Sequence, residues 1–243
     1  MISGTRLHET VRRDINRINS EYLKAVSVAD VDGFLTESWF TIYENLVQKS
    51  EVNSLADDRI KQKVLRSIPI KISKYDKDTV KIKYPKDTYR VIRRYAKACR
   101  EGCDSRNIQI HITQTSDLNE SVKDTYWEPS FEWEETLGIQ DKDGLIVYHN
   151  CKFDINEVVI DYYTKPKPIR CPQLIKTSGY KLGAYIDSNG DQVTTSSDFE
   201  IDSTDLWLKV SHYAAAKILM SMGDLQGYES LMKSVELDER ILL

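Results

Sequence analysis

The sequence predicts an α+β protein with helices at both ends of the chain and an antiparallel β region between them. Residues 1–68 carry apolar residues at helical spacing, residues 69–202 contain short stretches in which apolar and polar residues alternate, and residues 203–243 return to helical spacing. Runs of one class followed by runs of another favour α+β over alternating α/β. We expect two domains: a discontinuous helical bundle of residues 1–68 and 203–243, and a β-rich domain of residues 69–202.

Three helices are expected in the N-terminal section. The first lies within residues 1–28, the second begins at Asp30 or Asp32 as its N-cap, and the third runs from Leu55 to Ile68 and ends before Pro69. Their buried faces are defined by apolar residues at steps of three or four. These are Leu7, Val11, Ile15, Ile18 and Tyr22 in the first, Phe34, Leu35, Trp39, Ile42, Tyr43, Leu46 and Val47 in the second, and Leu55, Ile60, Val64, Leu65 and Ile68 in the third.

The pattern changes from helical to alternating at Ile70. Residues 70–84 alternate apolar and polar side chains on both sides of a charged turn, which predicts a β-hairpin. Residues 87–100 fit a helix or a strand, and we favour a strand because the alternating run 108–112 needs a partner. Three further strands are expected at residues 130–137, 145–149 and 157–164.

Turn residues separate these strands. Asp143-Gly144 is the expected turn between the strands at 130–137 and 145–149. Residues 154–156 are the expected turn between the strands at 145–149 and 157–164. Residues 165–169 (KPKPI) contain two prolines and predict an extended connector. Asn189-Gly190 predicts a last hairpin. Its arms are residues 180–186 and 192–195.

Residues 203–236 predict an αα-hairpin. Ser203 or Thr204 can cap the first helix, Gly223 can adopt the left-handed turn that ends it, and Asp224 can cap the second helix. We expect the N- and C-terminal helices to pack together, because neither set alone buries its apolar stripe.

The composition excludes several classes of protein. The 243-residue chain has a formal net charge of −4 and a pI near 5.7, so it lacks the overall basic charge typical of nucleic-acid-binding proteins. No apolar run approaches the about 20 residues that a membrane span needs. The charged first residues do not resemble a secretory signal, so a cytoplasmic setting is expected.

The residues that usually carry chemistry are scattered. Only Cys99 and Cys103 are close together, and no second Cys or His pair follows at a zinc-site interval, so we expect reduced thiols, no metal and no cofactor. The common nucleotide, hydrolase and calcium-binding motifs are missing. The remaining cysteines are Cys151 and Cys171, and the histidines are His8, His111, His149 and His212.

An acidic cluster with two tryptophans suggests one enzymatic alternative. Two carboxylates at a suitable separation can hydrolyse a glycosidic bond, and Trp127 and Trp133 could stack on a sugar ring. The four acidic residues are Glu128, Glu132, Glu134 and Glu135. The favoured interpretation is a half-exposed strand with Trp133 in the core, so a carboxylate-dependent glycan hydrolase is kept only as an alternative.

One segment is basic, with tyrosines between the cations. It contains Arg90, Arg93, Arg94, Lys97 and Arg100. Such a segment can contact nucleic acid, which gives a second alternative, a nucleic-acid-binding accessory protein. We favour a solvated face or a patch complementary to an acidic neighbouring subunit.

The order of features resembles that of the head-to-tail adaptor (neck ring, tail tubular) proteins of short-tailed bacteriophages, including the ring proteins of crAss-like phages. The resemblance covers most of the chain and rests on the following segments, in order: WFTIYENLV at 39–47, YPKDTYRVIRRY at 84–95, PSFEWEE at 129–135, VVIDYYTKPKPI at 158–169, and DLWLKVSHYAAAKILMSMGDLQGYESLM at 205–232.

This resemblance implies a structural virion protein and not an enzyme. It implies a homo-oligomeric ring, commonly of 12 copies, that joins the portal protein to other neck and tail proteins and through which genomic DNA passes without sequence-specific binding. It further implies a place in the virion neck, assembly in the host cytoplasm, and no membrane contact. The side chains we expect at interfaces are Trp39, Tyr43, Arg90, Arg93, Arg94, Trp127, Trp133, Tyr162, Tyr163 and Trp207.

Overall fold

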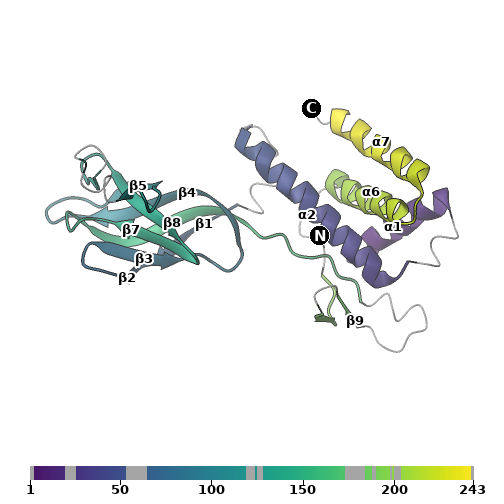
Figure 1. The fold of residues 1–243 in the computed structure, drawn as a ribbon, viewed down its shortest axis with the longest axis horizontal. Coiled ribbons are helices and arrows are strands. Elements are labelled where there is room, and N and C mark those ends of the chain that lie inside the picture. The colour runs from purple at the N-terminus through teal and green to yellow at the C-terminus, as the bar shows by residue number, and fades with distance from the viewer. Residues whose placement is uncertain are drawn as a thin grey trace. The chain divides into compact units, whose positions relative to one another are not determined.

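The chain folds into two compact units, one mainly helical and one built on a sheet. The computed structural model describes residues 3–19, 26–52, 65–118, 124, 128–172, 184–187, 190–197, 199 and 204–241. The helical unit comprises residues 1–57 and 166–243, and the β unit comprises residues 58–165 (Figure 1). The combination of helices with a central β region agrees with the predicted α+β class. Residues 166–202, expected in the β domain, belong to the helical unit, and residues 58–68 belong to the β unit.

The two N-terminal helices are α1 (Gly4–Ile18) and α2 (Val28–Val52). Helix α2 starts with a reciprocal cap: the Ser27 hydroxyl accepts from the Asp30 N–H at 3.1 Å, and the Asp30 carboxylate accepts from the Ser27 N–H at 3.0 Å. The N-cap is therefore Ser27, and not Asp30 or Asp32. Asp32 lies inside the helix and is buried.

The predicted third helix is wrong in its described part. Residues 53–64 lie outside the described residues, and Leu65–Lys71 form strand β1, which pairs antiparallel with β8 (Asp154–Thr164). Pro69 lies within β1, opposite Val159, and does not end a helix. Because β1 is an edge strand of the sheet, its free edge tolerates a residue that has no N–H to donate.

Eight strands of the described residues form one sheet, in the order β1-β8-β4-β5-β6-β7-β3-β2. The remaining strands are β2 (Ser73–Lys74), β3 (Thr79–Lys83), β4 (Thr88–Cys99), β5 (Arg106–Ile112), β6 (Glu135–Asp141) and β7 (Gly144–Tyr148). β1 and β2 lie at opposite edges of this order, yet only Ile72 separates them along the chain. Two peptide steps span at most about 7 Å, so the sheet must curl to bring its edges together there.

The strand prediction for residues 87–100 is confirmed, since β4 pairs with β5 from Tyr95↔Gln109 to Ala98↔Arg106. The prediction of a wholly antiparallel region is wrong at one position, because β5 and β6 run parallel with Gln109 opposite Glu135. A parallel pair needs a long connection. Residues 113–134 supply it.

Two predicted strand limits also need correction. Residues 131–134 form a turn closed by a bridge between Ser130 and Glu135, so the strand expected from residue 130 begins only at Glu135. Residues 154–156, expected as a turn, are the first residues of β8, and the turn lies at 149–153. The predicted turn before Gly144 and the hairpin of β2 and β3 are present.

The curled sheet encloses an apolar core. Alternate residues of the strands point into it, and Phe131 and Phe153 from the turns belong to it. Gly144 begins β7 where a Cβ atom would lie 1.9 Å from the Ile82 carbonyl oxygen, so only glycine fits this approach of β7 to β3. The buried strand residues include Val80, Ile82, Ala96, Ala98, Ile108, Ile110, Leu145, Val147, Val158 and Ile160.

The helical unit contains a two-stranded sheet and the C-terminal hairpin. Strand β9 (Tyr185–Ile186) pairs with β10 (Gln192–Val193), and α6 (Thr204–Ser221) is followed by α7 (Leu225–Ile241). Residues 165–169 have no regular secondary structure, as an extended connector predicts. None of the described helices combines the length and the apolar character that a bilayer crossing requires.

The helix junction is the one that the sequence predicts. Gly223 has φ +82°, its N–H bonds to the Met220 carbonyl, and the Asp224 N–H bonds to the Leu219 carbonyl, which is the Schellman arrangement. The Asp224 carboxylate then accepts from the Gly227 N–H at 2.8 Å. Helix α6 lies against α1, α2 and α7. Its Ala214, Ala215 and Ala216 are fully buried, as expected for close approach of another helix.

Candidate functional site

Half of the ten predicted interface residues are interior residues of their own unit. Each of these five is at most 5% exposed: Trp39, Tyr43, Tyr162, Tyr163 and Trp207. Trp39, for example, makes edge-on contacts with Tyr43 and Phe199, with ring centroids 5.3 and 4.9 Å apart. A side chain without exposed surface cannot contact a second copy in this conformation. These five aromatics therefore pack the core and are removed from the interface expectation.

Four of the ten predicted residues reach the surface of the β unit, and Trp127 lies outside the described residues. The four are Arg90, Arg93, Arg94 and Trp133. Trp133 is 65% exposed, so the expectation of a core tryptophan is wrong. Residues 131–134 form a turn instead of a strand, which turns Phe131 into the core and leaves Trp133 at the surface.

The basic segment lies on β4, where its cations are partly neutralised by acidic neighbours. Lys97 pairs with Glu157, and the Arg93 Nε lies 4.0 Å from the Asp161 carboxylate. Both acidic residues belong to β8, which runs beside β4. The basic character of this strand is therefore weaker in the folded protein than in the sequence.

An open depression of about 790 Å³ lies on the sheet beside these cations. Its walls carry two arginines, two side-chain amides, a tyrosine and one acidic residue, which can form many hydrogen bonds. The lining residues are Leu65, Ser67, Arg93, Arg94, Tyr95, Asn107, Gln109 and Asp161.

Two irregularities in β4 place large apolar side chains at the surface. The pairing of β4 with β8 shifts between Thr88 and Arg90 and again between Val91 and Arg93, so Tyr89 and Ile92 are extra residues on β4. These are β-bulges, which redirect side chains relative to a regular strand. Tyr89 is 40% exposed and Ile92 is 43% exposed. We call these two residues the bulge patch.

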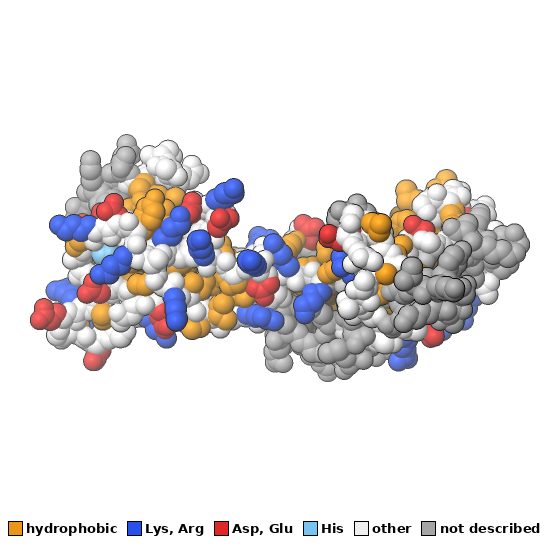
Figure 2. Space-filling model, turned by 90° about the horizontal axis from the view of Figure 1, so that it is seen from below, with side chains coloured by type: hydrophobic (Ala, Val, Ile, Leu, Met, Phe, Trp, Pro, Cys, Tyr) orange, Lys and Arg blue, Asp and Glu red, His pale blue; other side chains and the backbone are white. Residues whose placement is uncertain are grey.

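Hydrophobic side chains lie between charged ones on the face of the β unit drawn in Figure 2. Single exposed hydrophobic side chains are normal on protein surfaces, and a protein–protein contact combines such side chains at its centre with a polar rim. Simple alternation along β4 cannot reveal the bulge patch, because a bulge shifts the alternation by one residue.

The carboxylates of the acidic cluster are paired with neighbouring side chains. Each of its four carboxylates has a cationic or histidine neighbour: Glu128 with Lys152 at 2.7 Å, Glu132 with Arg100, Glu134 with Arg106 at 3.6 Å, and Glu135 with His111 at 3.6 Å. Hydrogen bonds from its own backbone N–H and from Arg100 hold the pKa of Glu132 below its usual value. A glycosidase acid needs a raised pKa, so Glu132 has the wrong perturbation for that role.

The helical unit also offers a concave surface, which we call the α2 groove. It has a volume of about 680 Å³ and lies between the first half of α2 and residues 168–170 and 185–187. Two of its apolar side chains are well exposed, Phe40 at 41% and Ile186 at 70%. Two acidic residues at the groove form ion pairs. Glu37 accepts a hydrogen bond from Lys217 at 2.7 Å, and Asp187 accepts one from Arg170 at 2.9 Å.

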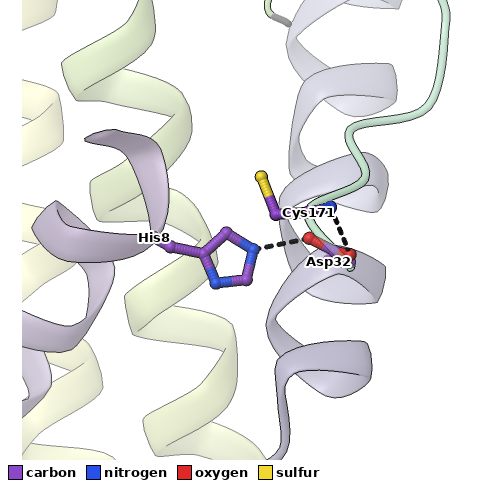
Figure 3. A group of neighbouring side chains, drawn as sticks. All are labelled: His8, Asp32 and Cys171. Atoms are coloured by element: carbon purple, nitrogen blue, oxygen red, sulfur yellow. Dashed lines mark hydrogen bonds and ion pairs between the residues drawn. The ribbon is translucent and has the colours of Figure 1, made fainter. Parts of the chain in front are cut away.

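A buried polar cluster lies beneath this groove, and the sequence interpretation missed it. Asp32 on α2 is bonded to His8 on α1, with 2.5 Å between His8 Nε2 and Asp32 Oδ1, and to the backbone N–H of Cys171 at 2.8 Å (Figure 3). The Tyr185 hydroxyl donates to the same carboxylate. Burial and this hydrogen bond raise the pKa of Tyr185. No sequence spacing links these residues, because they come from four separate segments.

Comparison of the sequence with protein-family models gives no match, and comparison with curated proteins gives none. The arrangement of the surfaces and sites described above therefore carries the functional argument.

Proposed function

We propose that this chain is a structural subunit of a homo-oligomeric ring in the head–tail connector, or neck, of a tailed bacteriophage. In this proposal the ring links the portal to the tail and encloses the DNA passage, and the chain performs no catalysis. The N- and C-terminal helices act as one helical bundle directed toward the portal, and the β unit is directed toward the tail. The proposed ring has 12 copies and remains in the neck of the virion.

The observation that carries the proposal is the presence of different exposed apolar surfaces on the two units. A closed ring uses heterologous contacts, in which one surface of each copy meets a different surface of the next copy. The β unit offers the bulge patch and Trp133, and the helical unit offers the α2 groove with Phe40 and Ile186. Each of these surfaces belongs to a single unit.

The chemistry of the described residues supports a role without catalysis. The acidic cluster is paired with cations, and the histidine–carboxylate–thiol cluster around Asp32 is buried away from solvent. A glycan hydrolase needs two carboxyl groups at a set separation, one of them with a raised pKa, whereas the pKa of Glu132 is lowered. The glycan hydrolase alternative therefore has no site among the described residues that favours it.

The charge of the chain is compatible with DNA passage. A channel that released DNA slowly would hinder genome delivery, and affinity for DNA grows with the number of cations that contact phosphates. The formal net charge is −4, and Arg93, Lys97 and Arg100 have acidic neighbours. These features support weak binding of DNA without sequence preference.

The depression on β4 and β5 gives the nucleic-acid-binding alternative a specific form. Arg93 and Arg94 lie beside Tyr95, Asn107 and Gln109, a set that can contact phosphates and bases. In the ring proposal the same depression receives an acidic part of a neck protein. DNA binding that is strong at low salt, weakens as salt rises, and is lost in Arg93→Ala/Arg94→Ala would favour the alternative.

Light scattering after size-exclusion chromatography tests the ring proposal. The double variant Tyr89→Ser/Ile92→Asp removes the apolar bulge patch and adds a charge. We expect this variant to assemble less than the wild-type chain does, either alone or on portal-containing particles. The control Thr115→Asp adds the same charge at another exposed position of the β unit and should assemble normally. Equal assembly by the double variant and the control would exclude the bulge patch as the contact.

A further inference from the structure

The polar cluster beneath the α2 groove contains three side chains of the types that bind transition metals. His8 comes from α1, Asp32 from α2, and Cys171 from the segment that follows the proline connector. The ligand atoms of the three all lie within 4.8 Å of one another, and all three residues are buried (Figure 3). Three segments that are far apart in the sequence thus bring an imidazole, a carboxylate and a thiol together.

These donors suit a zinc-type ion. Zn²⁺ binds thiolate, imidazole and carboxylate groups at about 2.0–2.3 Å with tetrahedral geometry, which places neighbouring ligand atoms about 3.3–3.8 Å apart. The His8 Nε2 and Asp32 Oδ1 atoms are 2.5 Å apart and are joined by a hydrogen bond. Side-chain rotations that move the ligand atoms by about an ångström would open this hydrogen bond to the separation of two ligands of one ion.

The charges also favour a divalent ion at this position. With a carboxylate, a thiolate and a neutral imidazole, the three ligands have a summed charge of −2, which a divalent cation balances. A buried charge without a partner is costly, so a neutral site is favoured in the interior. Binding releases the thiol proton of Cys171 and shifts the proton of neutral His8 from Nε2 to Nδ1.

Neighbouring groups hold the ligands in place. The Asp32 Oδ2 atom accepts from the Cys171 N–H and from the Tyr185 hydroxyl, which leaves Oδ1 directed at His8. Such outer contacts orient metal ligands in known sites. A Cβ atom at Gly4 would lie 2.3 Å from the Cys171 sulfur, so residue 4 leaves space for that sulfur only as glycine.

The cluster is incompletely satisfied as a hydrogen-bond network. Among the described residues, the His8 Nδ1 atom is buried and has no hydrogen-bond partner. An ordinary buried histidine usually bonds through both nitrogens. The hydrogen bonds of the cluster therefore satisfy the Asp32 carboxylate but only the Nε2 side of the His8 imidazole.

We propose that His8, Asp32 and Cys171 bind one Zn²⁺ ion that ties α1 and α2 to the segment around residue 171. A water molecule or the Tyr185 hydroxyl completes the four donors. Because the ligands are buried, the ion has a structural role and stabilises the helical unit. The inference concerns the interior of this unit and does not depend on the proposed ring function.

Cobalt titration of a single-thiol protein tests this site. The variant Cys99→Ser/Cys103→Ser/Cys151→Ser retains Cys171 as its only thiol, so any thiolate-to-cobalt charge-transfer band must come from Cys171. We expect one equivalent of Co²⁺ to produce this band together with the visible bands of tetrahedral cobalt. Zn²⁺ should abolish both by displacement. The chain is used at full length and without a histidine tag.

Substitutions in this single-thiol protein assign the other ligands. His8→Gln and Asp32→Asn keep the side-chain size, and each should weaken Zn²⁺ binding by at least about tenfold, because loss of even an outer partner of a metal ligand costs about that much. The matched control His111→Gln removes a histidine of the β unit and should leave binding unchanged. Circular dichroism shows which variants are folded.

Thermal unfolding provides the second measurement. Zn²⁺ should raise the Tm of the folded single-thiol protein, because a ligand that binds only the native state stabilises it. Zn²⁺ should leave the Tm of Asp32→Asn unchanged. Absence of the charge-transfer band in the folded single-thiol protein would overturn the proposal, and so would a band that persists in folded His8→Gln and Asp32→Asn.

Discussion

The Asp14 carboxylate on α1 lies 3.3 Å from Nε2 of His212 on α6, at a place where the Asp14 side chain is only 5% exposed. Burial raises the pKa of Asp14, and the nearby His212, Arg13 and Arg17 oppose that rise. The net effect is a carboxylate that ionises less readily in the folded chain than in the unfolded chain.

This pKa shift predicts a pH dependence of stability. A group whose pKa is raised by folding stabilises the fold below its unfolded value and loses that contribution as the pH rises through its folded value. Lowering the pH from neutral toward 3.8 should therefore make the wild type more stable relative to Asp14→Asn. Urea unfolding at several pH values measures the difference. The exposed Glu9→Gln on the same helix is the control, and a constant difference between wild type and Asp14→Asn would contradict the prediction.

The side chain of Thr36 joins α2 to the proline connector. Its hydroxyl accepts from the Ile169 N–H at 3.0 Å and lies 3.2 Å from the Ile169 carbonyl oxygen, to which it donates. Thr36→Val keeps the shape and loses both bonds, so we expect it to lower the free energy of unfolding by about 1–3 kcal/mol. Thr41→Val on the same helix removes only a bond to the Glu37 carbonyl and should cost less than about 0.5 kcal/mol. Equal losses in urea unfolding would contradict this role for Thr36.

Two glycine substitutions should have opposite effects. Gly144→Ala places a Cβ atom 1.9 Å from the backbone oxygen of Ile82, so it should destabilise the β unit by about 1–3 kcal/mol or more. Gly33 lies in α2 with open space around its Cβ position, so Gly33→Ala should stabilise the helical unit by about 0.5–1 kcal/mol. Thermal unfolding measures both signs, and a stabilising Gly144→Ala would refute the close approach of β7 to β3.

Substitutions of two aromatic residues in one turn should have different effects on stability and on assembly. Phe131 is 3% exposed, and Phe131→Ala should cost about 3–5 kcal/mol of stability, as truncation of a core phenylalanine does. Trp133→Ala should leave stability within about 0.5 kcal/mol, because this ring is exposed, and should reduce assembly. Urea unfolding and light scattering on the same samples provide the two readouts. A large stability loss in Trp133→Ala would contradict its assignment to the surface.

The sequence predicted most of the features that depend on local chemistry. The end of α6 at Gly223 and the cap of α7 by Asp224 follow from backbone conformation and side-chain hydrogen bonding within a few residues. The assignment of residues 87–100 to a strand followed from the need of the neighbouring alternating run for a partner. Local signals of this kind do not depend on distant contacts.

Features that depend on pairing between distant segments escaped the sequence analysis. Pro69 reads as a helix end, yet an edge position in the sheet accommodates it within β1. The bulges at Tyr89 and Ile92 are visible only from the register with β8. The fully buried Trp39 carries the same local signal as an exposed interface aromatic, because burial is decided by the segments that pack on it.

The polar cluster escaped for the same reason. His8, Asp32 and Cys171 are separated by large sequence intervals, and a metal-ligand spacing can be recognised in a sequence only when the ligands are close along the chain. The residues around Cys171 come to Asp32 because residues 166–172 belong to the helical unit. Because the β domain was expected to reach residue 202, the sequence prediction placed Cys171 in a different domain from His8 and Asp32.

Electron microscopy of the purified full-length chain, alone and mixed with portal rings encoded by the same genome, tests the ring proposal most directly. We expect closed rings of identical copies, stacked on the portal, in at least one of the two samples. Single particles of one chain in both samples would contradict the proposal.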